Sequence, residues 1–142
     1  MVTAESLLGR KSGALFSIAP DEPVLQAIQL MADHGIGAVL VMQGEALLGI
    51  VSERDYARKV VLLGRSSSDT PVGQIMSAPV VTVAPSASLD DCMRIMTEKR
   101  IRHLPVAHGA RVLGMLSIGD LVKAVIDEQK RTIEELENYI RS

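Results

Sequence analysis

The chain has 142 residues, of which 47% are hydrophobic and 23% charged, as is typical of a compact globular protein. A net charge of −2 without a basic block argues against nucleic acid as a partner, and an aromatic content of 2% removes the stacking surfaces of single-strand binders. The single cysteine excludes an internal disulfide and fits a reducing compartment. No apolar run reaches the ~20 residues of a membrane span. Residues 1–10 lack the regions of a signal peptide, so the sequence predicts a cytoplasmic protein without a membrane partner.

An internal repeat organises the chain, because the sequence shifted by 65 residues (Gly49 onto Gly114) aligns with itself without a gap. Residues 17–20 (Ser-Ile-Ala-Pro) align with 82–85 (Thr-Val-Ala-Pro), and residues 49–55 align with 114–120. A period this long is unlike that of a solenoid, and two copies of ~60 residues suggest two half-domains that bury each other.

The hydrophobic pattern predicts the element order β-α-β-β-α in each copy. In the first copy we expect a strand at 17–19, a helix from 21 to Gly35, strands at 38–42 and 46–51 around a tight turn, and a helix over 53–63 ended by Gly64. In the second copy we expect a strand at 81–83, a helix over 88–99, strands at 103–107 and 111–117, and a helix that begins at 118.

Segments outside the repeats complete the predicted organisation. Residues 65–71 are polar and Ser-rich, which indicates a linker or exposed loop, and 72–76 and 6–10 are expected to form short helices. The predicted divisions are an N-terminal segment (1–16), a first repeat (17–64), a linker (65–79), a second repeat (80–128) and a C-terminal helical extension (129–142).

The last helix continues to about Ile140 and breaks the symmetry of the repeat. Six positions, all apolar except Gln129, are spaced 4, 3, 4, 3 and 4 residues apart, as in a heptad seam. They are Val122, Ile126, Gln129, Ile133, Leu136 and Ile140. Such a helix packs either on its own domain or on a second subunit, and the length of the seam favours a homodimer.

Both copies carry the motif Gly-h-h-Ser-x-x-Asp, where h is apolar, at the junction of a strand and a helix. A serine at this place is a good N-cap, and an aspartate in the first turn suits the helix dipole. A capped turn explains one copy adequately but two copies in identical spacing less well. A hydroxyl and a carboxylate at a helix start also form a place to hold a sugar diol, and the backbone N–H groups there can meet an anion.

These paired units resemble a tandem pair of cystathionine β-synthase (CBS) domains, and residues 101–106 (Ile-Arg-His-Leu-Pro-Val) resemble the central strand of that family. The resemblance implies a mixed α/β (α+β) fold, with two β-α-β-β-α repeats packed about a pseudo-twofold axis and two clefts, followed by the extended C-terminal helix. Members of the family commonly bind adenosyl ligands, sense rather than catalyse, and form dimers.

By the motif match, Asp55 and Asp120 are candidates to bind ribose hydroxyls, since an ionised carboxylate can accept two strong hydrogen bonds. Ser52 and Ser117 are candidates for the ribose or the phosphate. Aliphatic walls would hold the adenine, and Ile36 is an expected contributor. Ile101 is the corresponding residue of the second copy.

The family places phosphate contacts near Arg102 and His103, and Arg54 is a further candidate. The alternatives are a solvated surface charge for each arginine and a partly buried polar residue for His103. Gly37 and Thr82 complete the predicted ligand-binding set. Because the first copy has Gly37 where the second has Arg102, the two clefts are not expected to be equivalent.

The sequence thus predicts a non-catalytic sensor that binds AMP, with ADP, ATP, NAD(P)(H) or S-adenosylmethionine as alternative ligands, and that requires no cofactor. The three histidines lack metal-ligand spacing with Cys92, and no catalytic triad or P-loop pattern occurs. The regulated target would be a separate protein. A nucleotide-independent dimerisation or interaction module is the alternative function.

Overall fold

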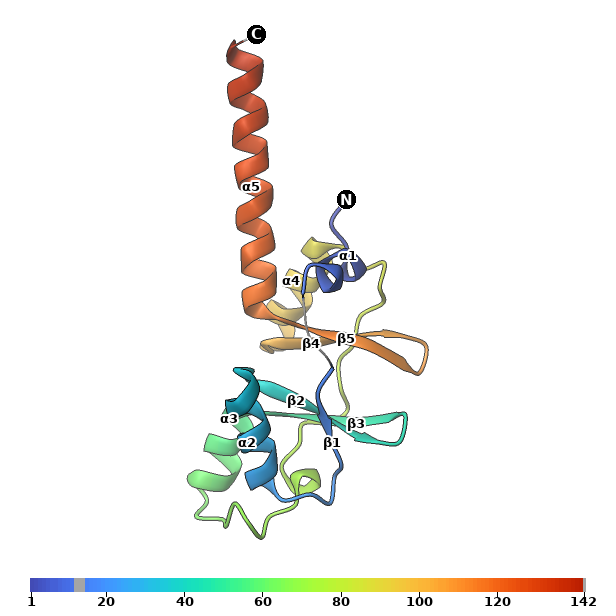
Figure 1. The fold of residues 1–142 in the computed structure, drawn as a ribbon, viewed down its shortest axis with the longest axis vertical. Coiled ribbons are helices and arrows are strands. Elements are labelled where there is room, and N and C mark those ends of the chain that lie inside the picture. The colour runs from blue at the N-terminus through green and yellow to red at the C-terminus, as the bar shows by residue number, and fades with distance from the viewer. Residues whose placement is uncertain (12–14, 142) are drawn as a thin grey trace. The chain divides into compact units, whose positions relative to one another are not determined.

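A computed structural model describes residues 1–11 and 15–141 of the protein (Figure 1). The fold is mixed α+β with two small sheets, ordered β1-β2-β3 and β4-β5, as predicted. The elements are α1 (Ala4–Gly9), β1 (Ser17–Ile18), α2 (Val24–His34), β2 (Ala38–Gln43), β3 (Ala46–Ser52), α3 (Glu53–Tyr56), the π-helix η1 (Ala57–Val61), the 3-10 helix η2 (Val72–Gln74), α4 (Leu89–Lys99), β4 (His103–His108), β5 (Arg111–Ser117) and α5 (Ile118–Arg141).

The described residues form two compact units. The first-repeat unit contains residues 15–81 and the turn at 109–112, and the second-repeat unit contains 1–11, 82–108 and 113–141. The N-terminal segment therefore belongs to the unit of the second repeat.

In the first-repeat unit, β1 pairs parallel with β2, and β2 pairs antiparallel with β3. The helix predicted to end at Gly35 is present as α2, whose residues Val24, Ala27 and Met31 are buried in the core with β2 and β3. Gly35 ends α2 at a φ of 61°, a left-handed conformation that glycine adopts without strain.

The predicted helix over 53–63 begins as α3 and continues as the π-helix η1, which ends at Val61. The wider turn is visible in its hydrogen bonds, because the N–H of Leu62 donates to the carbonyl of Ala57 at 3.0 Å. Gly64 follows with a φ of 68°, as expected for a residue that ends a helix.

The strand predicted at 81–83 is wrong, because only an isolated parallel bridge joins Val83 to Val106. The reason lies in the neighbouring strand, β4. In the first repeat, the N–H of Leu40 donates to the carbonyl of Phe16 and extends the β1 pairing. Shifted by 65 residues, Leu40 aligns with Pro105, which has no N–H to donate, so the ladder stops after one bridge.

The segment between the repeats packs on the first-repeat unit. The carbonyls of Thr70 and Ser67 accept hydrogen bonds from the N–H groups of Val24 and Leu25, both at 2.9 Å. These bonds serve the first turn of α2, where Pro23 offers no side-chain cap. Residues 65, 66, 68 and 69 of the predicted linker or exposed loop are exposed, whereas Thr70 is buried and Val72 and Ile75, just after it, enter the core.

The N-terminal segment plays the corresponding part in the second-repeat unit. The carbonyl of Val2 accepts from the N–H of Leu89, the first residue of α4, at 3.0 Å. Ala4 and Leu7 of α1 are buried, and α1 contacts α5. The short helix expected at 6–10 is therefore present as α1 (Ala4–Gly9), and it covers the core of the second repeat.

Helix α5 runs from Ile118 to Arg141 and continues far beyond the elements that cover its first turns (Figure 1). Its buried residues are Leu121 and Ala124, both near its start. Within residues 1–11 and 15–141, no helix is both long and apolar enough to cross a bilayer.

Candidate functional site: the two serine–aspartate junctions

Both predicted motifs form reciprocal capping pairs at the junction of a strand and a helix. In the second repeat, Ser117 Oγ accepts from the N–H of Asp120 at 3.2 Å, and Asp120 Oδ2 accepts from the N–H of Ser117 at 2.7 Å. In the first repeat, Ser52 and Asp55 make the same two bonds at 3.1 and 3.0 Å. Each aspartate therefore satisfies a backbone N–H that the helix start leaves without a partner.

The carboxylate of Asp55 is enclosed, and the residue is 9% exposed. Its Oδ2 also accepts from Ser52 Oγ at 3.0 Å. Its Oδ1 accepts from Ser77 Oγ at 3.1 Å and lies 3.2 Å from Lys59 Nζ. Lys59 donates in addition to the carbonyl of Ile75, so this network ties the segment after residue 65 to the first repeat. With both oxygens engaged, Asp55 acts as a structural clamp.

The carboxylate of Asp120 is more open, with 25% of its side chain exposed against 12% for Asp55. Lys11 Nζ lies 2.8 Å from its Oδ2 and also donates to the carbonyl of Met115 at 2.8 Å. Among the described residues, no group donates a hydrogen bond to its Oδ1. Burial by itself raises the pKa of Asp120, but the hydrogen bonds and charge of Lys11, together with the N–H of Ser117, outweigh it and lower the pKa. The group is therefore ionised at neutral pH.

Arg102 lies at this junction, because its carbonyl accepts from the N–H of Ile118, the first residue of α5, at 2.8 Å. Gly37 makes the equivalent bond to Glu53 in the first repeat, at 3.0 Å, but carries no side chain. The repeat thus places an exposed arginine at this backbone position in one junction and a glycine in the other.

His103 begins β4 and is half-buried. Burial lowers the pKa of His103, the nearby charges of Lys11 and Arg102 lower it further, and Asp120 partly opposes them. His103 is therefore neutral at pH 7. It shares one electrostatic environment with the three charged residues of the second-repeat junction.

The remaining predicted residues lie at the edges of these sites. Ile36 packs on the core of the first-repeat unit, Ile101 is half-buried just before β4, and Thr82 is exposed just before Val83. Arg54 is exposed in α3. The structure brings four predicted residues together in the second-repeat unit, namely Arg102, His103, Ser117 and Asp120.

Sequence reasoning missed Lys11, Lys59 and Ser77. Lys59 is four residues after Asp55 in a helical stretch, and that spacing could have revealed the ion pair. Lys11 gave no such signal, because the repeat aligns it with Met76 and it reaches Asp120 across 109 residues of sequence (120 − 11).

Histidine, cysteine and carboxylate side chains are common metal ligands in proteins. In the part of the chain that the structure describes, no group of three or more of them could hold a metal ion. Cys92 is buried in α4, where burial first and the charge of Asp91 second raise the pKa of its thiol. A thiol of this kind is a poor nucleophile.

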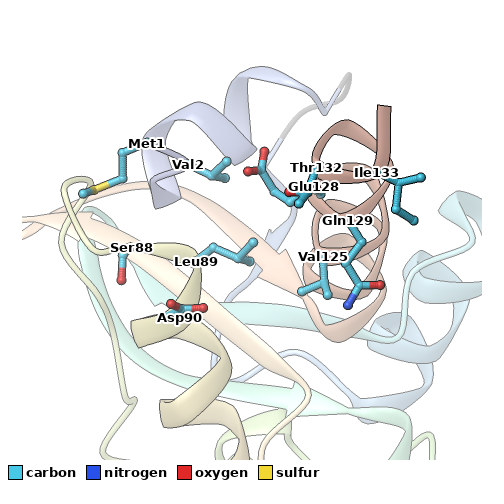
Figure 2. Close-up of a pocket in the computed structure, with 10 residues that line it drawn as sticks. All are labelled: Met1, Val2, Ser88, Leu89, Asp90, Val125, Glu128, Gln129, Thr132 and Ile133. Atoms are coloured by element: carbon cyan, nitrogen blue, oxygen red, sulfur yellow. The ribbon is translucent and has the colours of Figure 1, made fainter. Parts of the chain in front are cut away.

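A separate groove of about 730 Å³ lies in the second-repeat unit, between α5 on one side and the N-terminal segment and the start of α4 on the other (Figure 2). Its apolar wall is formed by Met1, Val2, Leu89, Val125 and Ile133. The groove contains none of the residues of the serine–aspartate junctions.

Comparison with known proteins agrees with the fold and the repeat. The family model of the CBS domain matches the chain twice, at residues 12–62 and 72–127. The protein therefore belongs to the CBS-domain family, as a tandem pair of repeats.

Its relatives are CBS-domain proteins. The mitochondrial CBS domain-containing protein CBSX3 of Arabidopsis thaliana is 41% identical over 126 residues, which are 85% of this chain, and the chain spans 61% of that protein's length. A solved structure from Burkholderia ambifaria, described as a signal-transduction protein with CBS domains, is 50% identical, with a TM-score of 0.87 over 90% of this chain and 96% of that one. A CBS domain protein of Pyrobaculum aerophilum, solved in complex with AMP, shares the fold at 21% identity, with a TM-score of 0.74 over 84% of this chain and 89% of that one.

Proposed function

We propose that the protein is a non-catalytic regulatory module that binds an adenosyl nucleotide at the second-repeat junction. The observation that carries the proposal is the state of Asp120, an ionised carboxylate fixed by Ser117 and Lys11 that is still one-quarter exposed. AMP is the first candidate ligand, and ADP, ATP, NAD(P)(H) and S-adenosylmethionine are the alternatives. The Pyrobaculum aerophilum protein with the same fold was solved with AMP.

Each residue of the junction has a part in this proposal. The Oδ1 atom of Asp120 accepts hydrogen bonds from the ribose hydroxyls, and such charge-assisted bonds belong to the stronger class. Ser117 orients the carboxylate through its backbone N–H. Arg102 and Lys11 supply positive charge for the phosphate, and Ile101 supplies an apolar surface for the adenine.

The first-repeat junction takes a secondary part. All the acceptor positions of Asp55 that the structure describes are used by Ser52, Ser77 and Lys59, so a ribose would have to displace one of them. In this proposal Asp55 binds nucleotide weakly or not at all. Contributions from Ile36, Gly37, Arg54 and Thr82 stay predictions.

The module acts as a sensor in this proposal, since a ligand that binds one arrangement of the chain better than another shifts the population towards it. The regulated target is a separate protein, and the protein is a homodimer. Oligomers occur elsewhere in this fold, because a similar CBS-CP12 protein from cyanobacteria, 26% identical with a TM-score of 0.76, is hexameric.

A thermal-shift screen with AMP, ADP, ATP, NAD⁺, NADH and S-adenosylmethionine tests the proposal. A nucleotide present at a hundred times its Kd stabilises the folded state by about 2.7 kcal/mol, which is readily seen as a rise in Tm. Asp120→Asn keeps the shape of the side chain but removes its charge, and it should abolish the rise. Asp55→Asn is the matched control and should retain it. The absence of a shift with every nucleotide would refute the proposal.

A nucleotide-independent interaction module is the second candidate, and the exposed apolar residues of α5 favour it. In that case a partner protein would be retained equally by the wild type and by Asp120→Asn, with or without nucleotide. A pull-down with the full chain, with and without AMP, separates the two functions.

A further inference from the structure

The apolar seam of α5 is uncovered along its whole length in the single chain. Val122 and Ile126 are 45% and 46% exposed, Ile133 and Leu136 are 54% and 57% exposed, and Ile140 is 81% exposed. Single exposed apolar residues are common, but a continuous row of this kind on one helix face marks an interaction surface. The 24 residues of α5 span about 36 Å at 1.5 Å per residue, well beyond the turns buried by its own unit.

We infer that two copies of the protein pair through their α5 helices in an antiparallel arrangement centred at residue 131. This inference rests on the proposed homodimer and adds its geometry. The seam places Ile126, Ile133 and Ile140 at heptad positions a, and Val122, Gln129 and Leu136 at positions d. An antiparallel pair sets each a residue against a d residue of the other helix.

The seam is self-complementary in this register, because each facing pair of residue numbers adds up to 262. Ile126 faces the partner's Leu136, Ile133 faces the partner's Gln129, and Ile140 faces the partner's Val122. All six positions are used in both helices. In a parallel pair each seam residue instead faces its own counterpart, so that Gln129 faces the partner's Gln129.

The charges beside the seam also favour the antiparallel pair. Lys123 and Glu137 occupy e positions, and the antiparallel register sets Lys123 beside the partner's Glu137, twice by symmetry. It also sets Lys130 beside the partner's Lys130, once. In a parallel pair the neighbours of these e positions are g positions, occupied by Ile118, Val125 and Thr132, so no ion pair forms. Opposed helix dipoles add to the preference.

The groove beside α5 supplies a third reason. Gln129 and Ile133 belong both to the seam and to the lining of the groove, and Met1, Val2 and Leu89 extend its apolar surface (Figure 2). In the antiparallel pair, the C-terminal half of the partner's α5, with Leu136 and Ile140, packs along the N-terminal half of α5, which lies beside the rest of the second-repeat unit. In a parallel pair those ends contact only each other, so less apolar surface is buried.

Charge reversal in the full-length protein tests the arrangement, with the dimer dissociation constant measured by analytical ultracentrifugation at low salt. Lys123→Glu should weaken the dimer about tenfold, because it turns two attractive pairs into repulsive ones. Glu137→Lys should do the same, and the double variant K123E/E137K should restore the wild-type value. Lys130→Glu is the matched control, because it replaces one repulsive pair by another and should leave the constant unchanged.

Cysteine cross-linking gives an independent result. A mixture of Ile126→Cys and Leu136→Cys chains should form an interchain disulfide on mild oxidation, whereas neither variant should cross-link with itself. Cys92 is fully buried and does not interfere.

The antiparallel arrangement would be overturned, and the homodimer kept, by two results together. Each cysteine variant would cross-link with itself, and K123E/E137K would fail to restore the wild-type dissociation constant. A wild-type protein that sediments as a monomer at all concentrations would overturn the homodimer itself, and neither result bears on nucleotide binding.

Discussion

The two serine–aspartate junctions start from the same motif and the same capping geometry, yet they differ in what surrounds the carboxylate. Asp55 is enclosed by Ser77 and Lys59, whereas Asp120 has Lys11 on one oxygen and remains partly exposed. The difference comes from the segments that pack against each repeat, the linker in one case and the N-terminal segment in the other. One motif therefore serves as a clamp in the first repeat and as a candidate binding site in the second.

The largest expected effect is on stability, and it distinguishes the enclosed Asp55 from the more open Asp120. Asp55→Ala should lower the free energy of unfolding by about 3 kcal/mol, because it leaves several partly buried donors without an acceptor. Asp120→Ala should cost about 1 kcal/mol, as expected for the loss of a capping pair near solvent. Urea unfolding of the two variants measures the difference. Equal losses would show that the two junctions are alike.

The glycines that open the two motifs sharpen the same comparison. A Cβ on Gly49 would lie 2.6 Å from Met76 Sδ and 3.0 Å from the backbone carbonyl of Ser77. A Cβ on Gly114 would lie 2.8 Å from Leu8 Cδ2, the end of a flexible side chain that can move. Gly49→Ala should therefore destabilise the protein by about 2 kcal/mol and Gly114→Ala by about 1 kcal/mol or less, as measured by urea unfolding. If Gly114→Ala lowered the free energy of unfolding more than Gly49→Ala, the linker residues Met76 and Ser77 would be able to shift more easily than α1.

A smaller effect is the dependence of stability on pH that comes from His103 in the second repeat. Because His103 has a lowered pKa when folded, the unfolded chain binds more protons below about pH 6.5, the usual value for histidine. Stability that is present above this pH should therefore be lost as the pH falls below it. His103→Gln should flatten this part of the curve of Tm against pH, and His108→Gln, at an exposed position, should not. An unchanged curve for His103→Gln would contradict the assignment.

The smallest expected effect on stability comes from Lys11. Lys11→Met should cost about 0.5 kcal/mol, because the ion pair is partly exposed to solvent. It should also raise the pKa of Asp120, whose lowered value depends on this lysine. A carboxyl titration followed by NMR measures that rise, with Lys11→Arg as the control that keeps the charge. No rise would show that Ser117 alone keeps Asp120 ionised.

Much of the fold could be predicted from the sequence, because local patterns determine it. The end of α2 at Gly35 and the helix expected over 88–99 follow from periodicity and from rules for helix ends, and the structure has both, the second as α4. The missing strand at 81–83 also has a local cause in Pro105, and the alignment of the repeats could have shown it.

The surroundings of the site could not be predicted in this way. The motifs identify Ser117 and Asp120, but the difference between the junctions depends on Lys11 and Ser77, which come from segments outside the repeats. The repeat aligns Lys11 with Met76, so comparing the two copies hides the lysine. Contacts between distant segments leave no period in a sequence.

The placement of α1 has a consequence for how the polypeptide can be divided. A break after residue 81 would leave the first fragment with the linker but without residues 109–112 of its unit, while the second fragment would lack residues 1–11, including the lysine that meets Asp120. The two fragments would therefore be unequal, because the first lacks one short turn and the second lacks helix α1 and the ionic partner of Asp120.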